Sequence, residues 1–456
     1  MPPEQFPNSR VSHLINGNLG KNIWLLAWPM FISAILQNCQ SIIDLFWVGK
    51  LGSNAIAALA VSGTVLMLVF PLIMGFSIGT VALISRRVGA GEYKKASEIA
   101  FQSLLFSFCT GIIIGFTGYI ITGNLLYRMK VDQLVAGMAQ EYLHISFLGI
   151  FTVFILIVAS SALQAAGDAK FPMKIMIISN ILNLILDPLF IFGVPGILPG
   201  AKVKGAAFAT VTAQFISSFI ILYHLQKGIN IIKIQFSSFV PNIPMLITLI
   251  KIGLPASFQM FSRSLMSLVL MHIVAAFGTS SIAAYGIGMR FHMILLMPAF
   301  TIGNAAATLV GQNLGARKIY RAVRTAWLAA VIGMIILAAG SMLFFIYASS
   351  IMNLFDKNEE VIKIGTGFLK LVSPFYLFSA LGIIITRCLQ GAGKTIAPMI
   401  ITIVSLWGFQ IPAAIYLPAY FPTTPIYGVW WAMAMTMVLN AVMSTGWFLT
   451  GRWKKV

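Results

Sequence analysis

Long runs of apolar residues, separated by short polar stretches, fill almost the whole chain. Each run exceeds the ~18 residues that a helix needs to cross the hydrocarbon core of a bilayer. None shows the alternation of apolar and polar residues that is typical of a membrane β-barrel. The pattern therefore predicts an all-α polytopic membrane protein with twelve transmembrane helices, at residues 23–48, 54–84, 97–122, 134–161, 171–193, 205–226, 246–275, 281–311, 322–349, 364–389, 396–418 and 427–450.

Composition and charge support this interpretation. The chain is 59% hydrophobic and 9% charged, whereas a soluble domain carries about 25% charged residues. The net charge of +19 does not indicate nucleic-acid binding, because the basic residues occupy short loops between apolar segments. With the N-terminus in the cytoplasm, the inner loops hold 20 of the 30 basic residues and the outer loops hold seven. This excess predicts a multi-pass protein of the cytoplasmic (inner) cell membrane, with both termini in the cytoplasm.

The sequence contains an internal repeat, because a shift of 226 residues brings landmarks of the two halves into register. Six helices in each half give both halves the same orientation in the membrane. We therefore expect two parallel six-helix lobes, at residues 1–230 and 246–456, joined by a cytoplasmic connector at 231–245. We also expect the protein to work as a monomer. The matched landmarks are Pro29 with Pro255, Gly52 with Gly278, Gly89-Ala90 with Gly315-Ala316, and Pro172-Met173 with Pro398-Met399.

Two of the eleven acidic residues, Asp44 and Asp187, lie well inside apolar segments. An ionisable side chain in hydrocarbon is costly, so its presence indicates a functional site. Two amides precede each acid at a spacing that places all three side chains on one helical face. These amides are Gln37 and Gln40 for the first acid, and Asn180 and Asn183 for the second.

The two acids predict a proton or cation site that is confined to the first lobe. Leu270 stands in the place of Asp44 in the second half, and Ala413 in the place of Asp187. Two neighbouring carboxylates in a low dielectric are not both ionised, so we expect one of them to hold a proton near neutral pH. The nearby amide oxygens offer Na⁺ as an alternative coupling ion, and a purely structural hydrogen-bonded clamp is the other interpretation. Beyond this possible Na⁺ site we expect no metal and no cofactor.

Both acidic helices contain a proline. Pro29 lies fifteen residues before Asp44, and Pro188 directly follows Asp187. Proline removes one helical hydrogen bond and clashes with the carbonyl four residues earlier, which weakens the helix locally. We interpret the two prolines as hinges whose bending is linked to protonation.

Cationic and thioether side chains fall inside segments of the second half. A flexible methionine surface suits apolar ligands of varied shape, although ordinary core packing is the favoured explanation of these methionines. An arginine inside an apolar segment can snorkel to the interface, pair with carbonyls or line a water-filled cavity. The arginines therefore favour anionic or carbonyl-bearing ligands only weakly. The candidates for a substrate cavity are Gln37, Arg263, Arg290, Met260, Met289 and Met293.

Several function classes are excluded by what the sequence lacks. The stretch Gly391–Thr395 (GAGKT) lacks the first glycine of a nucleotide-binding loop, and no strand precedes it. No nucleophiles, histidines and carboxylates cluster as an enzyme would require. Two parallel bundles without a selectivity filter favour a transporter over a channel. Transport without a nucleotide must use an ion gradient.

The paired turns RRVGAGEYKKA and GQNLGARKIYRA, and LQAAGDAKFPM and LQGAGKTIAPM, resemble the multidrug and toxic compound extrusion (MATE) family of the MOP superfamily over residues 20–450. The polar stretch from Asn180 to Asp187 resembles its prokaryotic DinF-like branch. The resemblance implies alternating access and export of amphipathic, generally cationic compounds in exchange for H⁺ or Na⁺, with Asp44 and Pro29 in the coupling helix. A flippase for lipid-linked precursors, from the same superfamily, is the alternative that Arg263 and Arg290 leave open.

Overall fold

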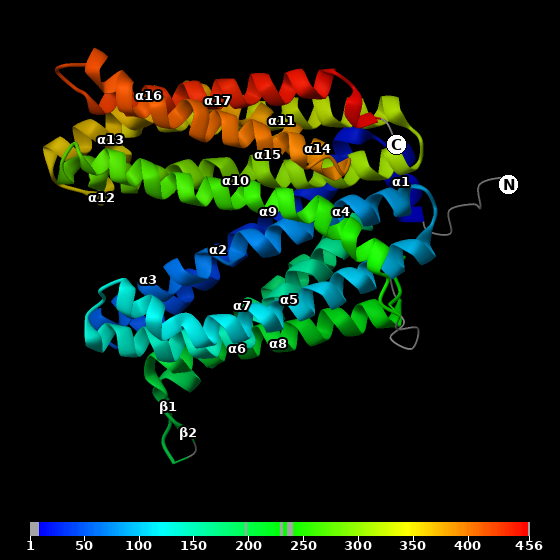
Figure 1. The fold of residues 1–456 in the computed structure, drawn as a ribbon, viewed down its shortest axis with the longest axis horizontal. Coiled ribbons are helices and arrows are strands. Elements are labelled where there is room, and N and C mark those ends of the chain that lie inside the picture. The colour runs from blue at the N-terminus through cyan, green and yellow to red at the C-terminus, as the bar shows by residue number, and fades with distance from the viewer. Residues whose placement is uncertain (1–8, 197, 229–230, 235–239, 455–456) are drawn as a thin grey trace. The chain divides into compact units, whose positions relative to one another are not determined.

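The computed structural model of the chain describes residues 9–196, 198–228, 231–234 and 240–454. Within these residues, twelve helices are long and apolar enough to cross a membrane, which confirms the predicted all-α membrane fold. Short strands β1 (Gly193–Val194) and β2 (Leu198–Pro199) pair antiparallel after one of these helices. Figure 1 shows the helices as long, roughly aligned rods within each part of the chain.

The chain divides into two compact units, which we call unit 1 and unit 2. Unit 1 contains Trp28–Gly253, and unit 2 contains Ser12–Ala27 and Leu254–Val456. The few described residues before Ser12 cluster with unit 1. These limits differ from the predicted lobes in two places, because the first long helix begins in unit 2 and the seventh begins in unit 1. Part of the predicted connector, residues 235–239, lies outside the described residues.

In unit 1, α6 is the most buried long helix, and it packs against α3, α4, α5 and α8. Helix α7 packs mainly against α8, which places the second acidic helix at the side of the bundle. The helices, coloured from blue to green in Figure 1, are α2 (Leu19–Gly49), α3 (Ser53–Met67), α4 (Phe70–Gly89), α5 (Tyr93–Arg128), α6 (Gln133–Ala165), α7 (Lys170–Phe192) and α8 (Lys202–Lys227).

The prediction of one continuous helix at 54–84 was wrong. The chain forms two helices there, with a break at Leu68 and Val69. Pro71 lies in the first turn of α4 and has no N–H to donate to the carbonyl of Met67. Helix α3 therefore ends at Met67, and the new helix α4 begins with the proline in its first turn.

In unit 2, α10 packs against α11, α13 and α14, and α17 packs against α14. The fully buried Trp430, Tyr376 and Phe368 lie in the apolar core between these helices. The helices are α1 (Ser9–Asn16, its last five residues in this unit), α9 (Ile243–Ala275, from Leu254), α10 (Thr279–Gly315), α11 (Ile319–Ile346), α12 (Ala348–Phe355), α13 (Glu359–Val372), α14 (Tyr376–Gly391), α15 (Ile396–Ile403), α16 (Ile411–Tyr416) and α17 (Ile426–Leu449).

Short irregular turns interrupt two of the predicted segments of unit 2. The segment predicted at 364–389 begins earlier, at Glu359. The apolar pattern missed this start because the first turn of the amphipathic helix α13 is charged. The turn Ser373–Phe375 then separates α13 from α14, and a π-helical turn at Val404–Gln410 separates α15 from α16. Further 3₁₀ turns lie at Leu417–Tyr420 and Arg452–Lys454.

Helix α1 is fastened to the start of α2 and to α11 in unit 2. The side-chain amide of Asn22 donates to the carbonyls of His13 at 2.9 Å and Leu14 at 3.1 Å. Arg321 donates to the carbonyls of Leu14, at 3.5 Å, and Gly17. These bonds satisfy carbonyls that the end of a helix leaves without partners.

The segment before α9 is fastened to α5 in unit 1 in a comparable way. The side chain of Gln102 donates to the carbonyl of Val240 at 2.8 Å and accepts from the backbone N–H of Asn242 at 3.2 Å. Each repeat therefore anchors the start of its first helix in the other unit.

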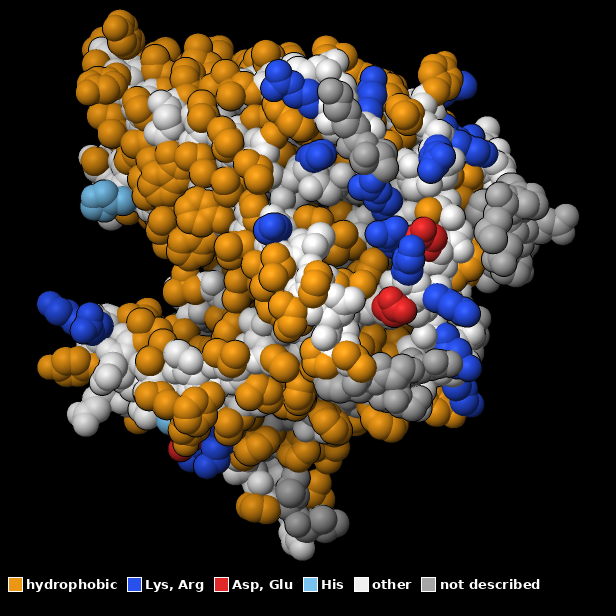
Figure 2. Space-filling view, turned by 45° about the vertical axis from the view of Figure 1, so that its right-hand side comes forward, with side chains coloured by type: hydrophobic (Ala, Val, Ile, Leu, Met, Phe, Trp, Pro, Cys, Tyr) orange, Lys and Arg blue, Asp and Glu red, His pale blue; other side chains and the backbone are white. Residues whose placement is uncertain are grey.

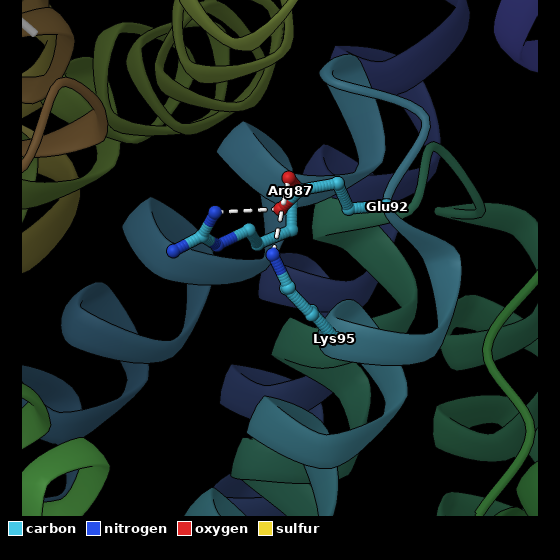
Figure 3. A network of polar contacts seen from close by, with 3 residues as sticks. All are labelled: Arg87, Glu92 and Lys95. Atoms are coloured by element: carbon cyan, nitrogen blue, oxygen red, sulfur yellow. Dashed lines mark hydrogen bonds and ion pairs between the residues drawn. The ribbon is translucent and has the colours of Figure 1, made fainter. Parts of the chain in front are cut away.

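Figure 3 shows a charged network at the turn between α4 and α5. The carboxylate of Glu92 accepts from Arg87 at 2.5 Å and from Lys95 at 3.3 Å. Burial alone would raise the pKa of Glu92, but the two cations outweigh burial and hold this pKa below its usual value. At the same place in the repeat, unit 2 has Lys318, which donates to Asn16 of α1 instead. The same turn of the repeat thus forms a local ion-pair network in unit 1 and a hydrogen bond to α1 in unit 2.

The surface is that of a lipid-embedded protein. Large apolar side chains are exposed along the membrane helices, including Phe116 on α5, Phe219 on α8 and Ile335 on α11. Figure 2 shows hydrophobic side chains over much of the face drawn, while most of its Lys and Arg side chains gather toward one side. Such apolar coverage is far larger than the patches of soluble monomers and indicates contact with hydrocarbon.

Two glycine pairs show that the repeat is structural. Gly52 and Gly278 have φ angles of 106° and 96° and directly precede α3 and α10. This region of φ is readily open only to glycine. Gly205 and Gly428 correspond at a shift of 223 residues, because the register slips by three residues near the end of the repeat. Each lets its helix approach a backbone closely, at Phe190 in unit 1 and at Pro418 in unit 2, where a Cβ would overlap main-chain atoms.

We predict that Gly205→Ala and Gly428→Ala each destabilise the protein by about 1–3 kcal/mol, because the added methyl group forces two backbones apart. Melting of the purified protein in detergent, followed by fluorescence-detected gel filtration, measures the effect. Gly137→Ala is the control, because this helical glycine has nothing near the position of a Cβ. Melting temperatures equal to the control would contradict the close approach.

Candidate functional site

Asp44 and Asp187 meet inside unit 1. They come from α2 and α7, and their side chains are 8% and 0% exposed. The carboxyl group of Asp44 lies within hydrogen-bonding reach of Asp187, Asn183 and Thr210. A hydrogen bond between two carboxyl groups requires a proton on one of them, because ionised carboxylates only accept. The geometry therefore suits a group that carries a shared proton or a bound cation.

Asn183 joins the acids to a third helix. Its side-chain N–H group donates to Oδ1 of Asp187 at 3.1 Å and to the hydroxyl oxygen of Thr210 at 3.3 Å. Thr210 belongs to α8, so the polar group is held by α2, α7 and α8 together. Thr210 could not be identified from the sequence, because threonines in membrane helices commonly bond to their own backbone, as Thr64 does to Ala60.

An apolar cluster closes the site on one side. Val48 and Ile191, each four residues after one of the acids, lie in a buried cluster with Tyr142 of α6. Tyr142 lies near Ser146 and close enough to both carboxyl groups to interact with their charges. Water is excluded on this side, which strengthens every electrostatic interaction of the acids. Tyr142 is a second residue that the sequence pattern did not reveal.

The site is rich in oxygen atoms that lack partners. Asp44 Oδ1, Asp187 Oδ2, Asn183 Oδ1 and Asn180 Oδ1 are buried without a hydrogen bond from any described residue, as is Nε2 of Gln40. A buried polar atom left unsatisfied costs about 1–3 kcal/mol. Carboxylate and amide oxygens are ligands for hard cations. The residues therefore fit a site whose acceptors are satisfied by a proton or by a small cation.

Three amides of the predicted stripes behave differently. Asn180 donates to the carbonyl of Met176 in its own helix at 2.9 Å, and Gln40 is buried without a partner for its N–H group. Gln37 is exposed. The described residues contain no group of three or more His, Cys, Asp or Glu side chains that would hold a metal ion.

The prolines lie where the sequence predicted, inside α2 and α7. The hydroxyl of Ser33 donates to the carbonyl of Pro29 at 2.9 Å. The border between the units falls between Ala27 and Trp28, directly before Pro29. The second border falls between Gly253 and Leu254, directly before Pro255 inside α9. Both helices that pass between the units therefore carry a proline at the passage.

A cavity of about 220 Å³ lies within unit 2. Arg263, Met289 and Met293, three of the predicted cavity residues, are part of its wall. Met260 is half-buried and Arg290 is exposed, and neither belongs to the wall. The structure thus brings together half of the predicted set.

Comparisons with known proteins agree with both the repeat and the fold. A family model described as MatE matches the chain twice, at residues 29–189 and 255–417. The chain is 26% identical over 460 residues to the "Probable multidrug resistance protein NorM" of Thermotoga maritima, covering 100% of this chain and 95% of that protein. A solved MATE structure in the bent conformation matches with a TM-score of 0.90 and 26% identity, covering 98% and 99% of the two chains. One in the straight conformation matches with a TM-score of 0.89 and 25% identity, covering 98% and 100%.

We predict that Asn183→Ala destabilises the protein by about 1–3 kcal/mol, since it removes the donor that serves both Asp187 and Thr210. Asn180→Ala is the matched control, one helical turn away, because its amide bonds only within α7. Thermal melting in detergent at neutral pH measures both variants. Equal losses from the two substitutions would show that Asn183 has no special role in holding the acids.

Proposed function

Because the chain belongs to the MatE family of multidrug efflux transporters, we propose that it couples export to an ion bound at Asp44 and Asp187. The protein is a multi-pass membrane transporter of small molecules and not an enzyme. The finer proposal is antiport, in which H⁺ or Na⁺ enters while an amphipathic, generally cationic compound leaves. The observation that carries it is the buried pair of carboxyl groups with unsatisfied oxygen atoms around it.

The confinement of this pair to one unit supports a coupling role. Both units keep the same scaffold, yet Leu270 occupies the place of Asp44 in the repeat. An element that only held helices together would need no acid, since apolar side chains of similar size pack at lower cost. We therefore assign the acids to ion exchange, with Asn183, Asn180, Gln40 and Thr210 supplying the surrounding polar atoms.

Helix α2 offers a path from the ion to the conformation of the transporter. It begins in unit 2, passes Pro29 at the border of the units, and reaches Asp44 roughly 22 Å further along its axis. Binding or loss of a proton changes the attraction between Asp44 and α7. A proline joint is the weakest point along α2 at which such a change can bend the helix. Relatives solved in bent and straight conformations support bending within this fold.

Alternating access between the two units completes the proposal. We place the protein in the cytoplasmic (inner) membrane as a monomer with both termini in the cytoplasm, on the excess of basic residues in the inner loops. A flippase for lipid-linked precursors is the second candidate, and the cavity-lining Arg263 favours it. Growth distinguishes the two, because loss of a flippase is expected to stop growth, whereas loss of an exporter sensitises cells to toxic compounds.

We predict that Asp44→Asn and Asp187→Asn each abolish ion-driven export while the protein still inserts and folds. An amide keeps the size of the carboxyl group but cannot exchange a proton or carry its charge. Ethidium efflux from proteoliposomes, under separately imposed H⁺ and Na⁺ gradients, measures coupling and identifies the ion. Glu141→Gln is the control, because Glu141 is exposed and forms only a loose surface pair with Lys204 at 3.9 Å. Wild-type efflux by both Asn variants would refute the coupling role.

We also predict that Pro29→Ala slows ethidium efflux by about tenfold or more while ethidium binding stays close to wild type, since restoring a helical hydrogen bond stiffens the joint. Efflux and equilibrium binding are measured on the same preparation. Pro298→Ala is the control, because Pro298 lies inside α10 and away from both borders of the units. Equal rates for the two variants would exclude a hinge at Pro29.

A further inference from the structure

The cavity of unit 2 carries a positive charge that none of the described residues balances. Arg263 is half-buried near the middle of α9 and forms part of the cavity wall. No hydrogen bond or ion pair to its guanidinium group is found among the described residues. A buried charge is normally paired, because an unpaired one is costly in a low dielectric.

Acidic residues are absent from the wall of this cavity. Residues 254–456 contain only three acids, Asp356, Glu359 and Glu360, and all lie at the turn between α12 and α13. A second cation, Arg387 of α14, lies close enough to feel the charge of Arg263. Arg387 is already bound to Gln390 at 3.1 Å and lies over the ring of Phe300. Arg263 is therefore the cation left free for a ligand.

The rest of the wall suits an aromatic acid. Phe300, Met289 and Met293 provide apolar and polarisable contacts. His292 of the wall has Nδ1 2.9 Å from the hydroxyl of the fully buried Tyr376. When Tyr376 donates to Nδ1, the N–H group at Nε2 remains as a second donor. An arginine and a histidine N–H beside apolar side chains match a carboxylate attached to a ring.

The repeat makes this cavity the counterpart of the acidic site. At the shift of 226 residues, Arg263 corresponds to Gln37 and Leu270 corresponds to Asp44. Arg263 and Leu270 both belong to the cavity wall, seven residues apart on one face of α9. Duplication has thus given the same helix face an acid in unit 1 and a base in unit 2.

We propose that the cavity of unit 2 is a binding site for small aromatic anions, with the guanidinium group of Arg263 as the counter-ion. A volume of about 220 Å³ accommodates an aromatic carboxylate or the anionic end of a longer molecule. The site extends the cargo of the exporter beyond the cations that its family resemblance implies. It rests on the proposed function only in treating the bound anion as cargo.

A charge series on one ring system tests the site. Naphthoate, naphthylmethanol and naphthylmethylammonium are titrated by calorimetry into the protein in lipid nanodiscs, with empty nanodiscs as the blank. Naphthoate is expected to bind about tenfold or more tightly than the alcohol, and the ammonium compound most weakly. Equal affinities, or tightest binding of the ammonium compound, would overturn the proposal without any variant.

Substitutions then assign the preference to one residue. Arg263→Gln is expected to weaken naphthoate binding by about tenfold or more, and Arg263→Lys to keep part of the preference because the charge remains. Arg324→Gln is the control, since Arg324 is exposed on α11 and absent from the wall. Unchanged naphthoate binding by folded Arg263→Gln protein would also overturn the proposal.

The measurement needs no ion gradient, so it is independent of coupling at Asp44. Naphthoate binding together with failed ion-driven efflux would refute the proposed function and leave this site standing. Ion-driven ethidium efflux without a preference for naphthoate would refute this site and leave the proposed function standing.

Discussion

The cost of placing a carboxyl group in a low dielectric is the constraint on which the first half of this protein depends. Asp44 and Asp187 are buried where water does not solvate them, and only polar neighbours or a bound ion offset that cost. Asn183 and Thr210 supply part of the compensation from two further helix positions. Several oxygen atoms stay unsatisfied. A site that the protein satisfies only in part is poised to respond to an ion, which is the property an ion-coupled transporter needs.

A second constraint is that each backbone polar group in the membrane must find its partner within the same helix. A helix that passes from one unit to the other can therefore bend most easily where its backbone hydrogen bonds are already interrupted. Both α2 and α9 pass from one unit to the other, and both carry a proline directly after the border. The anchoring of α1 on α11 and of the segment before α9 on α5 fixes the far ends of these helices. The motion that we propose between the units would therefore bend the chain at Pro29 and Pro255.

Much of this architecture follows from the sequence, and the exceptions have physical reasons. Apolar runs predicted the membrane helices. The matched spacing of two amides before each of Asp44 and Asp187 predicted a polar group between two helices. Thr210 was missed, because hydropathy does not distinguish a threonine that bonds across helices from one that bonds within its own. The break before α4 was missed as well. Pro71 causes this break, but it lies within a long apolar run that looked compatible with one continuous helix.

The two units illustrate how duplication separates scaffold from chemistry. The scaffold requires positive φ at Gly52 and Gly278, and no other residue type meets that requirement without strain. The side chains at equivalent positions of α2 and α9 meet no such restriction, since one helix has Gln37 where the other has Arg263. Charge at these positions was free to diverge once each unit folded around the same backbone. Under the two proposals, the ion binds at the acids of unit 1 and an anionic cargo binds at Arg263 of unit 2, so the ion and that cargo would not compete for one site.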